Sequence, residues 1–182
     1  AMKEFLKHGY AGTSMDKIAK VAGVSKATVY SHFGDKESLF NALMQDLVKD
    51  KFQTVLSLDR PQSLEQEPQK VLSAMATKMI ETAQNDRAFC DFMRIVIGES
   101  GRFPELAKAY VNNMAKPAIE ILTHYFQSHP QLKLEDPEAT VRVMMGSLIY
   151  FIILQEMMHA KDIIPLESDR LVNTVINLIT KS

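Results

Sequence analysis

Hydrophobic positions recur every three or four residues along most of the chain, which is the period of an amphipathic helix. Over residues 36–57 this pattern contains Leu39, Phe40, Leu43 and Leu47, and no glycine or proline interrupts it. Similar patterns predict helices over residues 69–84, 86–97, 104–128, 137–159 and 166–180. No strand-like alternation or Asn-Gly hairpin competes, so we predict an all-α fold.

Glycine and proline divide the chain into two differently built regions. Four of the seven glycines fall in the first 34 residues, whereas all seven prolines lie from Pro61 onward. The first helices should therefore be short, and the earliest, which opens at Ala1 within a helical pattern, is expected to be truncated. Pro117 should kink the helix predicted over 104–128. We predict an N-terminal domain over 1–46 and a larger helical domain over 47–182.

Residues 15–33 have the length and punctuation of a helix-turn-helix. Gly23 supplies the backbone freedom that a tight turn between two helices needs, and Ser25 is a good N-cap for the second helix. The apolar residues expected to pack the two helices together are Ile18, Ala22, Val24, Val29 and Phe33.

The outward face of the second helix carries mostly small and polar side chains, which suit a DNA major groove about 12 Å wide. These residues are Lys26, Ala27, Thr28, Tyr30 and Ser31. Ser14 and Ser25 would direct helix N-termini outward, where backbone N–H groups can bind phosphate oxygens. Asp35 can cap the next helix, which places Lys36 in its first turn. This pattern favours a recognition helix that reads DNA.

Residues 5–43 resemble the TetR family of bacterial regulators. The resemblance rests on Phe5, Gly9-Tyr10, Thr13-Ser14-Met15, Ile18-Ala19, Ala22-Gly23-Val24-Ser25 and the run Thr28-Val29-Tyr30-Ser31-His32-Phe33-Gly34-Asp35-Lys36-Glu37-Ser38-Leu39-Phe40. Residues 92–106 are also similar to the regulatory domain of the AefR-like subgroup. The resemblance implies a dimeric repressor that binds an operator on double-stranded DNA and leaves it when a small effector binds the C-terminal domain.

The resemblance also implies roles for single residues. Lys26, Ala27 and Thr28 would approach bases, and Lys26 and Thr28 are the expected specificity residues. The residues expected to contact phosphates and set the register are Thr13, Ser14, Tyr30, His32 and Lys36.

Charge supports this picture only locally. The whole chain has a net charge of -1, but residues 1–52 hold eight lysines, no arginine and a net charge of +2. Without arginine, the commonest reader of guanine, lysines and hydroxyls must contact the DNA, and affinity should fall steeply with salt. The single Cys90 excludes an intramolecular disulfide and fits a reducing compartment, for which the cytoplasm is the default.

The C-terminal region is rich in methionine and aromatic residues, which line adaptable apolar cavities. We therefore expect an effector cavity there, although each residue could instead belong to the core. The expected ligand-binding residues are Phe89, Phe92, Met93, Phe103, Tyr110, Met114, Met145 and Tyr150.

The apolar run from Val143 to Leu154 is shorter than the roughly 20 residues of a membrane helix, so it predicts a buried helix and no membrane partner. This run and the last helix together hold more apolar side chains than the core of one small domain would bury. The resemblance implies that these two helices form a four-helix bundle in a homodimer; an internal core alone is the alternative. The expected dimer residues are Leu148, Phe151, Ile152, Gln155, Leu171, Val175 and Leu178.

The sequence holds no phosphate-binding glycine loop, no nucleophile with a placed base and no complete metal-ligand set, so we predict neither an enzyme, a cofactor nor a metal site. The pairs Glu120 with His124 and Glu156 with His159 could each supply only half of a metal site. A helical protein-interaction module that has lost specific DNA binding stays open as an alternative function.

Overall fold

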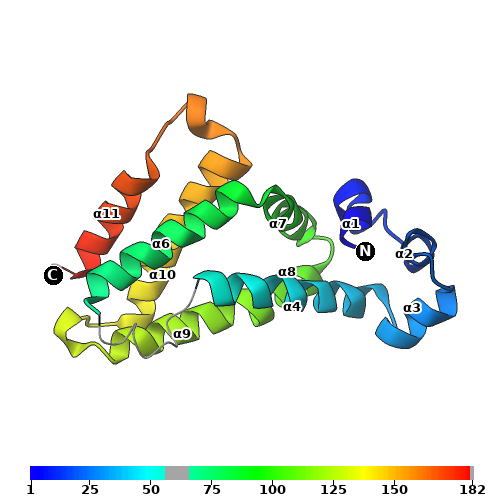
Figure 1. Cartoon of the computed structure of the whole chain (residues 1–182), viewed down its shortest axis with the longest axis horizontal. Helices are drawn as coiled ribbons and strands as arrows, with labels where there is room; N and C mark the ends of the chain where they lie inside the picture. Colours follow the sequence, from blue (N-terminus) through cyan, green and yellow to red (C-terminus); the bar gives the residue numbers. More distant parts are fainter. Residues whose placement is uncertain (56–65, 181–182) are drawn as a thin grey trace. The chain divides into compact units, whose positions relative to one another are not determined.

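The computed structural model describes residues 1–55 and 66–180, and the side chains of 48–55 are left out of the description (Figure 1). Every regular element within these residues is a helix, which confirms the predicted all-α fold. The predicted helix over 36–57 is observed as α4, Lys36–Val55. Its expected end at Ser57 and the start of the loop predicted from residue 60 lie outside the described residues.

The chain divides into two compact units. The first comprises residues 1–50 and 88–115, and the second comprises residues 51–87 and 116–182. The helices of the first unit are α1 Met2–His8, α2 Met15–Ala22, α3 Lys26–Phe33, most of α4, α7 Arg87–Glu99 and α8 Pro104–Tyr110, followed by a π-helical turn η2, Val111–Ala115. The predicted boundary after residue 46, between a DNA-binding and an effector-binding domain, stays a prediction. The two structural units are divided differently, since the first unit also contains residues 88–115.

The core of the first unit contains a cluster of five aromatic rings, hereafter the aromatic cluster: Phe5, Tyr10, Phe40, Phe92 and Phe103. Phe40 meets Phe5 and Tyr10 edge-on, with ring centroids 5.4 Å apart in each pair. The Phe103 ring lies 4.9 Å from that of Tyr10, and Phe92 stacks on Phe40. Aromatic pairs at such distances add to the free energy gained by burial alone. The cluster therefore joins α1, α4, α7 and the residue preceding α8.

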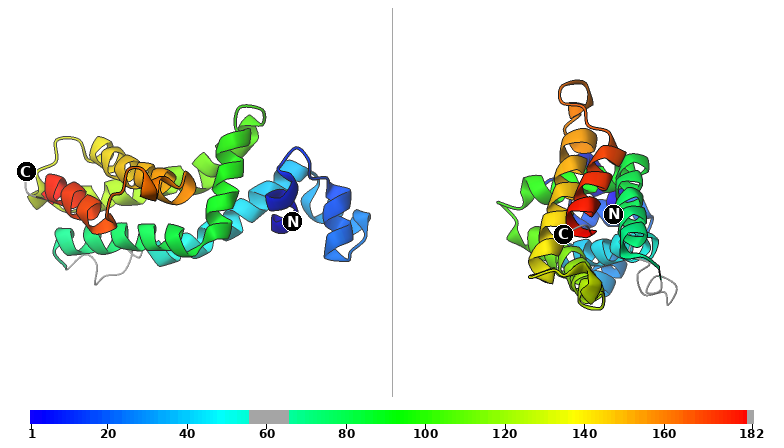
Figure 2. Two further views of the ribbon diagram at one scale, coloured as in Figure 1. Left: turned by 90° about the horizontal axis from the view of Figure 1, so that it is seen from above. Right: turned by 90° about the vertical axis from the view of Figure 1, so that its left-hand side faces the viewer.

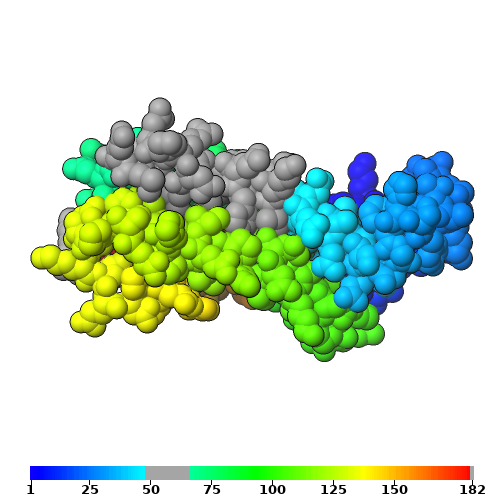
Figure 3. All heavy atoms as spheres, turned by 90° about the horizontal axis from the view of Figure 1, so that it is seen from below, coloured from blue at the N-terminus to red at the C-terminus, as the bar shows by residue number. Residues whose placement is uncertain are grey.

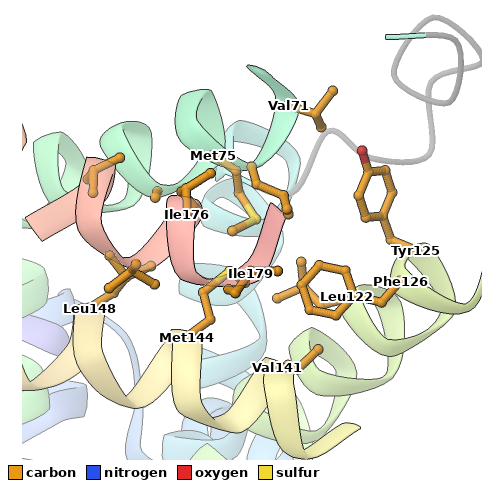
Figure 4. Packing of buried hydrophobic residues seen from close by; sticks show 14 of the residues in the cluster. Val71, Met75, Leu122, Tyr125, Phe126, Val141, Met144, Leu148, Ile176 and Ile179 are labelled. Atoms are coloured by element: carbon orange, nitrogen blue, oxygen red, sulfur yellow. The ribbon is translucent and has the colours of Figure 1, made fainter. Parts of the chain in front are cut away.

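The second unit is built from α6 Pro68–Asn85, α9 Lys116–Gln127, α10 Pro137–Ile152 and α11 Ser168–Thr180. The views in Figures 1 and 2 agree that α11 lies beside α6, and these two helices contact each other along their lengths. Their buried faces share one core with α9 and α10 (Figure 4). The fully buried members of that core include Leu72, Leu122, Val141, Met144 and Leu148.

Most helix boundaries lie within two residues of the prediction, but the helix predicted over 104–128 is interrupted. The α-helical pattern of α8 gives way to the π-turn η2 at Val111–Ala115 and resumes in α9. Pro117 follows directly in the first turn of α9. A proline lacks the N–H of a helical hydrogen bond and clashes with the carbonyl four residues earlier, so the disturbance falls in the preceding turn.

The helix predicted over 137–159 is also shorter than expected. It is α-helical only to Ile152, then forms a π-turn, η4 Ile153–Met157, and ends before a short 3₁₀ turn, η5 Ala160–Asp162. His159 between them adopts a left-handed conformation with φ of 56°. A helix cannot continue through a residue with this backbone angle, so the chain turns here toward α11.

Pro137–Met157 is a stretch of 21 residues that is long and apolar enough to cross a membrane by length and composition alone. Only 22% of an 18-residue apolar segment of this stretch is buried within the chain. One such helix is weak evidence for a membrane span, because the core helix of a soluble protein has the same composition. Its inner side packs in the second unit, and its outer side exposes Val143 and Tyr150.

Candidate nucleic-acid interface

The two helices of the motif begin and end at the residues expected from the sequence. The Ser14 hydroxyl accepts the N–H of Lys17 at 3.3 Å, and the Ser25 hydroxyl accepts the N–H of Thr28 at 3.1 Å. Gly23 ends α2 in the left-handed region, with φ of 68° and ψ of 24°. Each serine satisfies an N–H that the helix itself leaves unpaired. The predicted helix-turn-helix is therefore confirmed.

The packing between α2 and α3 differs in part from the expectation. Ile18 and Val29 are buried as predicted, and Phe33 is half-buried. Ala22 and Val24 are exposed, so their predicted place between the helices is wrong. Both flank the left-handed turn at Gly23, where the chain leaves the shared face. Ala19 and Met15, about one and two turns before Ala22 on α2, are buried instead.

The outer face of α3 is open to solvent in the chain, as the space-filling view shows for this helix (Figure 3). Its exposed residues are Lys26, Ala27, Thr28, Tyr30, Ser31 and His32. The Ser25 and Thr28 hydroxyls lie 2.8 Å apart, and the Ser31 hydroxyl donates to the Thr28 carbonyl at 3.0 Å. The cap and the first turns of α3 thus hold their polar side chains in defined positions.

Asp16 on α2, which is not among the residues predicted from the sequence, contacts the recognition helix. Lys26 Nζ donates to Asp16 Oδ2 at 2.8 Å and lies 5.6 Å from the centroid of the Tyr30 ring. This hydrogen bond to the Asp16 carboxylate raises the pKa of Lys26. The two partners are ten residues apart on different helices, so only the angle between α2 and α3 brings them together. A helical pattern in the sequence carries no signal for such a pair.

Thr13 is buried, unlike the other predicted DNA-binding residues. Its hydroxyl donates to the carbonyl of Gly9 at 2.7 Å and lies 3.0 Å from the carbonyl of Glu4. These contacts hold α1 against the start of α2. A phosphate contact by the Thr13 hydroxyl would require it to leave this buried position, so the structure favours a structural role for it.

Lys36 also makes contacts within the chain. Its ammonium donates to the carbonyls of Tyr10 at 2.8 Å and Thr13 at 3.1 Å, and it lies 4.3 Å from the centroid of the Tyr10 ring. Burial lowers the pKa of Lys36, whereas burial and the nearby Glu105 raise the pKa of Tyr10 to about 12. An ammonium has three hydrogens, so one remains for a phosphate.

Asp35 is the N-cap of α4, as predicted. Its Oδ1 accepts the N–H of Ser38 at 2.7 Å, and this hydrogen bond lowers the pKa of the carboxyl. The cap fixes the first turn of α4, in which Lys36 lies.

The predicted effector-binding residues are distributed over both units. In the first unit Phe92 and Phe103 belong to the aromatic cluster, Met93 is buried, and Phe89, Tyr110 and Met114 are half-buried. In the second unit Met145 is half-buried and Tyr150 is 63% exposed. The ligand contacts of all eight remain predictions.

The predicted dimer residues fall into two groups. Leu148, Phe151, Gln155 and Val175 are buried within the second unit and offer almost no surface to a partner. The Gln155 amide donates to the Ile164 carbonyl at 3.0 Å, and this hydrogen bond supplies the partner that a buried amide needs. Ile152 and Leu171 are half-buried, and Leu178 is 71% exposed.

Two exposed apolar residues on α10 were missing from the expected dimer set. Val143 is 68% exposed and Tyr150 is 63% exposed, and their separation of seven positions places both on one side of the helix. On α11, Leu178 is exposed and Leu171 is half-buried, and these four residues are hereafter named the outer apolar face of the second unit. The signal was present in the sequence, because residues seven apart share a helix face, but an apolar run leaves the choice of face open.

Within the described residues, no group of three or more His, Cys, Asp or Glu lies close enough to hold a metal ion. Glu120 lies 3.9 Å from the ammonium of Lys116, and Glu156 pairs with Lys161 at 2.8 Å. Carboxylates from both of the candidate half-sites thus face lysines.

Two family models cover most of the chain. The model of bacterial regulatory proteins of the tetR family matches residues 1–43, and that of the AefR-like transcriptional repressor C-terminal domain matches residues 70–181. The chain belongs to the TetR family. The first match contains the helix-turn-helix, and the second begins in α6 and runs through α11.

Sequence similarity to the curated relatives covers about a quarter of the chain. The uncharacterized regulator YhgD of Bacillus subtilis strain 168 is 44% identical over 50 residues, which make up 28% of this chain and 26% of YhgD. The chain thus spans about a quarter of the length of the curated relatives that it matches. Two solved structures extend the likeness to the whole fold.

The flavonoid-responsive regulator FrrA is 27% identical with a TM-score of 0.73, and the match covers 100% of this chain and 91% of FrrA. AibR, crystallised with isovaleryl coenzyme A and operator DNA, is 20% identical with a TM-score of 0.65, and the match covers 98% of this chain and 93% of AibR. At that identity the likeness to AibR concerns the fold alone.

Proposed function

We propose that the protein is a homodimeric transcriptional repressor that leaves a palindromic operator when a small apolar or amphipathic effector binds. In this proposal residues 1–46 bind DNA, and residues 47–182 bind the effector and the second subunit. The observation that carries it is the capped helix α3, whose outer face is exposed while Val29 anchors its inner face.

The chemistry of α3 suits a major groove. Lys26 can donate to guanine O6 and N7, the Thr28 hydroxyl can donate or accept, and Ala27 is small enough to let the helix approach the base edges. In this proposal Tyr30, His32 and the remaining hydrogen of Lys36 contact phosphates, which fix the register of a helix on the duplex.

The outer apolar face of the second unit supports a homodimer. Val143, Tyr150 and Leu178 are each more than 60% exposed, and a second copy would remove this apolar surface from water. Two-fold symmetry would present two recognition helices to successive major grooves, about 34 Å apart along DNA. A dimer of this kind reads an inverted repeat.

The effector proposal rests on the composition of α7, α8 and their neighbours. Phenylalanines and methionines adapt to apolar ligands, and the fold relatives FrrA and AibR are named for a flavonoid and crystallised with an acyl coenzyme A, respectively. Phe92 on α7 touches Phe40 on α4, so a ligand that displaces Phe92 would shift α4, which follows the recognition helix directly. Release from DNA follows if the shifted state fits the operator less well.

The family comprises transcriptional regulators and not enzymes, and its DNA-binding members are generally cytoplasmic. We extend both properties to this protein, with no cofactor in the proposed mechanism. The AefR-like repressor domain over residues 70–181 favours repression over activation.

Selection of bound duplexes from a random pool, at two salt concentrations, tests the proposal. Enrichment of an inverted repeat is expected, together with its loss in the double variant Lys26→Ala/Tyr30→Ala, in which the exposed positions leave the fold intact. Uniform binding without any enriched sequence would contradict the operator and favour a helical interaction module that no longer reads DNA.

A further inference from the structure

The ion pair between Asp16 and Lys26 adds little to the stability of the fold. The Asp16 and Lys26 side chains are 58% and 61% exposed, and exposed pairs contribute little because water and salt screen them. Its consequence is instead the position of the Lys26 ammonium and the anionic partner that it already has. The ammonium is held at the first turn of α3, between the Asp16 carboxylate and the Tyr30 ring, on the face that the proposed function turns toward DNA.

A lysine held in this way differs from a free lysine in its response to DNA. Phosphates lie all along a duplex, so Lys26 can meet one wherever the protein is placed. If Lys26 bound a phosphate, its ammonium would only exchange one anionic partner, the Asp16 carboxylate, for another. A guanine edge offers two acceptors, O6 and N7, at one position in the groove. Because an ammonium has three hydrogens, Lys26 can donate to a correctly placed guanine while it stays paired with Asp16, whereas the negative charge of Asp16 repels a phosphate that approaches the same ammonium.

We infer that Asp16 is a specificity-determining residue of the recognition helix, which holds Lys26 off phosphates and leaves it able to donate to a guanine of the operator. This inference rests on the proposed DNA-binding function. Asp16 does not itself need to touch DNA, since it acts through the position and pairing of Lys26. It lowers affinity for unrelated sequences and so raises the ratio of specific to non-specific binding.

Asp16→Asn tests this inference, because it removes the charge and keeps the shape. The freed Lys26 should gain a phosphate, so the slope of log K against log salt on an unrelated duplex becomes steeper by about 0.9 for each recognition helix engaged. One additional phosphate contact with that slope strengthens non-specific binding roughly five- to tenfold at about 0.1 M salt. The ratio of operator to non-specific affinity should fall by the same factor.

Asp46→Asn is the matched control. Asp46 is exposed on α4 more than two turns beyond Lys36, so its replacement makes the same change in net charge without touching α3. The double variant Asp16→Asn/Lys26→Ala is the second control: relative to Lys26→Ala alone, it should show no change in slope or in ratio. Both controls are measured on full-length protein.

Equal slopes for Asp16→Asn and Asp46→Asn would overturn the inference, as would an equal effect of Asp16→Asn when Lys26 is absent. These results are independent of the operator, because the slope is read on an unrelated duplex. Failure of the wild-type protein to select any operator would contradict the proposed function, while the slopes would still decide whether Asp16 restrains Lys26.

Discussion

The Phe92 ring on α7 stacks on the Phe40 ring on α4, with their centroids 4.9 Å apart and their planes inclined by 20°. Both side chains are almost completely buried. Phe40 lies one turn after Lys36, so a helix with predicted effector-binding residues contacts the helix that follows the recognition helix. Because a packed core has few empty spaces, a displacement of Phe92 must move Phe40 or create a cavity.

Replacement of Phe92 by alanine should lower the free energy of unfolding by about 3–5 kcal/mol, because a buried ring is lost and a cavity remains. Phe92→Leu should cost less, since leucine fills part of that space. Chemical denaturation measures both. Ile97→Ala on the same helix is the control, because Ile97 is half exposed and should cost under about 1 kcal/mol. Equal losses for Phe92→Ala and Ile97→Ala would contradict the burial of Phe92.

Two glycines with open surroundings should respond oppositely to alanine. Neither Gly23 nor Gly98 has an atom within 4 Å of the position of an added Cβ, so no clash arises at either. Gly23 has φ of 68°, where a side chain costs about 1 kcal/mol, whereas Gly98 lies within α7 without a positive φ. Thermal unfolding should show a loss for Gly23→Ala and a gain of about 0.5–1 kcal/mol for Gly98→Ala. A gain at both positions would mean that the turn at Gly23 tolerates other conformations.

Val143→Asp should dissociate the proposed homodimer. A carboxylate placed in an apolar interface loses its hydration, so the dissociation constant should rise by at least about a hundredfold. Val111→Asp is the control, because Val111 is 49% exposed on η2 and lies outside the outer apolar face of the second unit. Analytical ultracentrifugation measures both. A dimer that tolerates Val143→Asp as well as Val111→Asp would exclude this face of α10.

Tyr125→Phe should stabilise the second unit by about 1 kcal/mol at pH 7. The Tyr125 hydroxyl is buried and has no hydrogen-bond partner among the described residues, and a buried polar group without a partner is costly. In Figure 4 this hydroxyl is directed away from Met144 and Leu148. Tyr150→Phe, at an exposed position, should change the stability by less than about 0.5 kcal/mol.

The same variant should alter the alkaline limb of stability. Burial raises the pKa of Tyr125 to about 12, above its ordinary value of 10.0, because the phenolate is poorly solvated there. Ionisation of Tyr125 therefore disfavours the folded state, so its contribution to stability is constant below pH 10 and stability is lost as the pH rises toward 12. Unfolding measured across this range should decline less steeply in Tyr125→Phe. The pKa of Tyr10 is also raised to about 12, so Tyr10 should still contribute to the loss of stability at alkaline pH in the variant. Identical curves for the variant and the wild type would contradict the raised pKa of Tyr125.

Local signals in the sequence were sufficient for the helix-turn-helix. The caps Ser14, Ser25 and Asp35 each accept an N–H three residues further along the chain, and Gly23 turns the chain within its own backbone. Interactions of such short range depend on residue type and spacing alone. For the same reason the periodic apolar pattern predicted the helices and their approximate ends.

The sequence by itself therefore determined the helical class, the capped motif and the helix expected to enter the groove. Only the tertiary structure decided which faces meet. Leu148 is buried and Tyr150 exposed within one apolar run, and Asp16 reaches Lys26 while Ala22 does not reach α3's inner face. A helix whose sides are all apolar does not specify its inward side, and partners from different helices meet only at a particular rotation and crossing angle. Those angles are set by packing of the whole core, which no local spacing encodes.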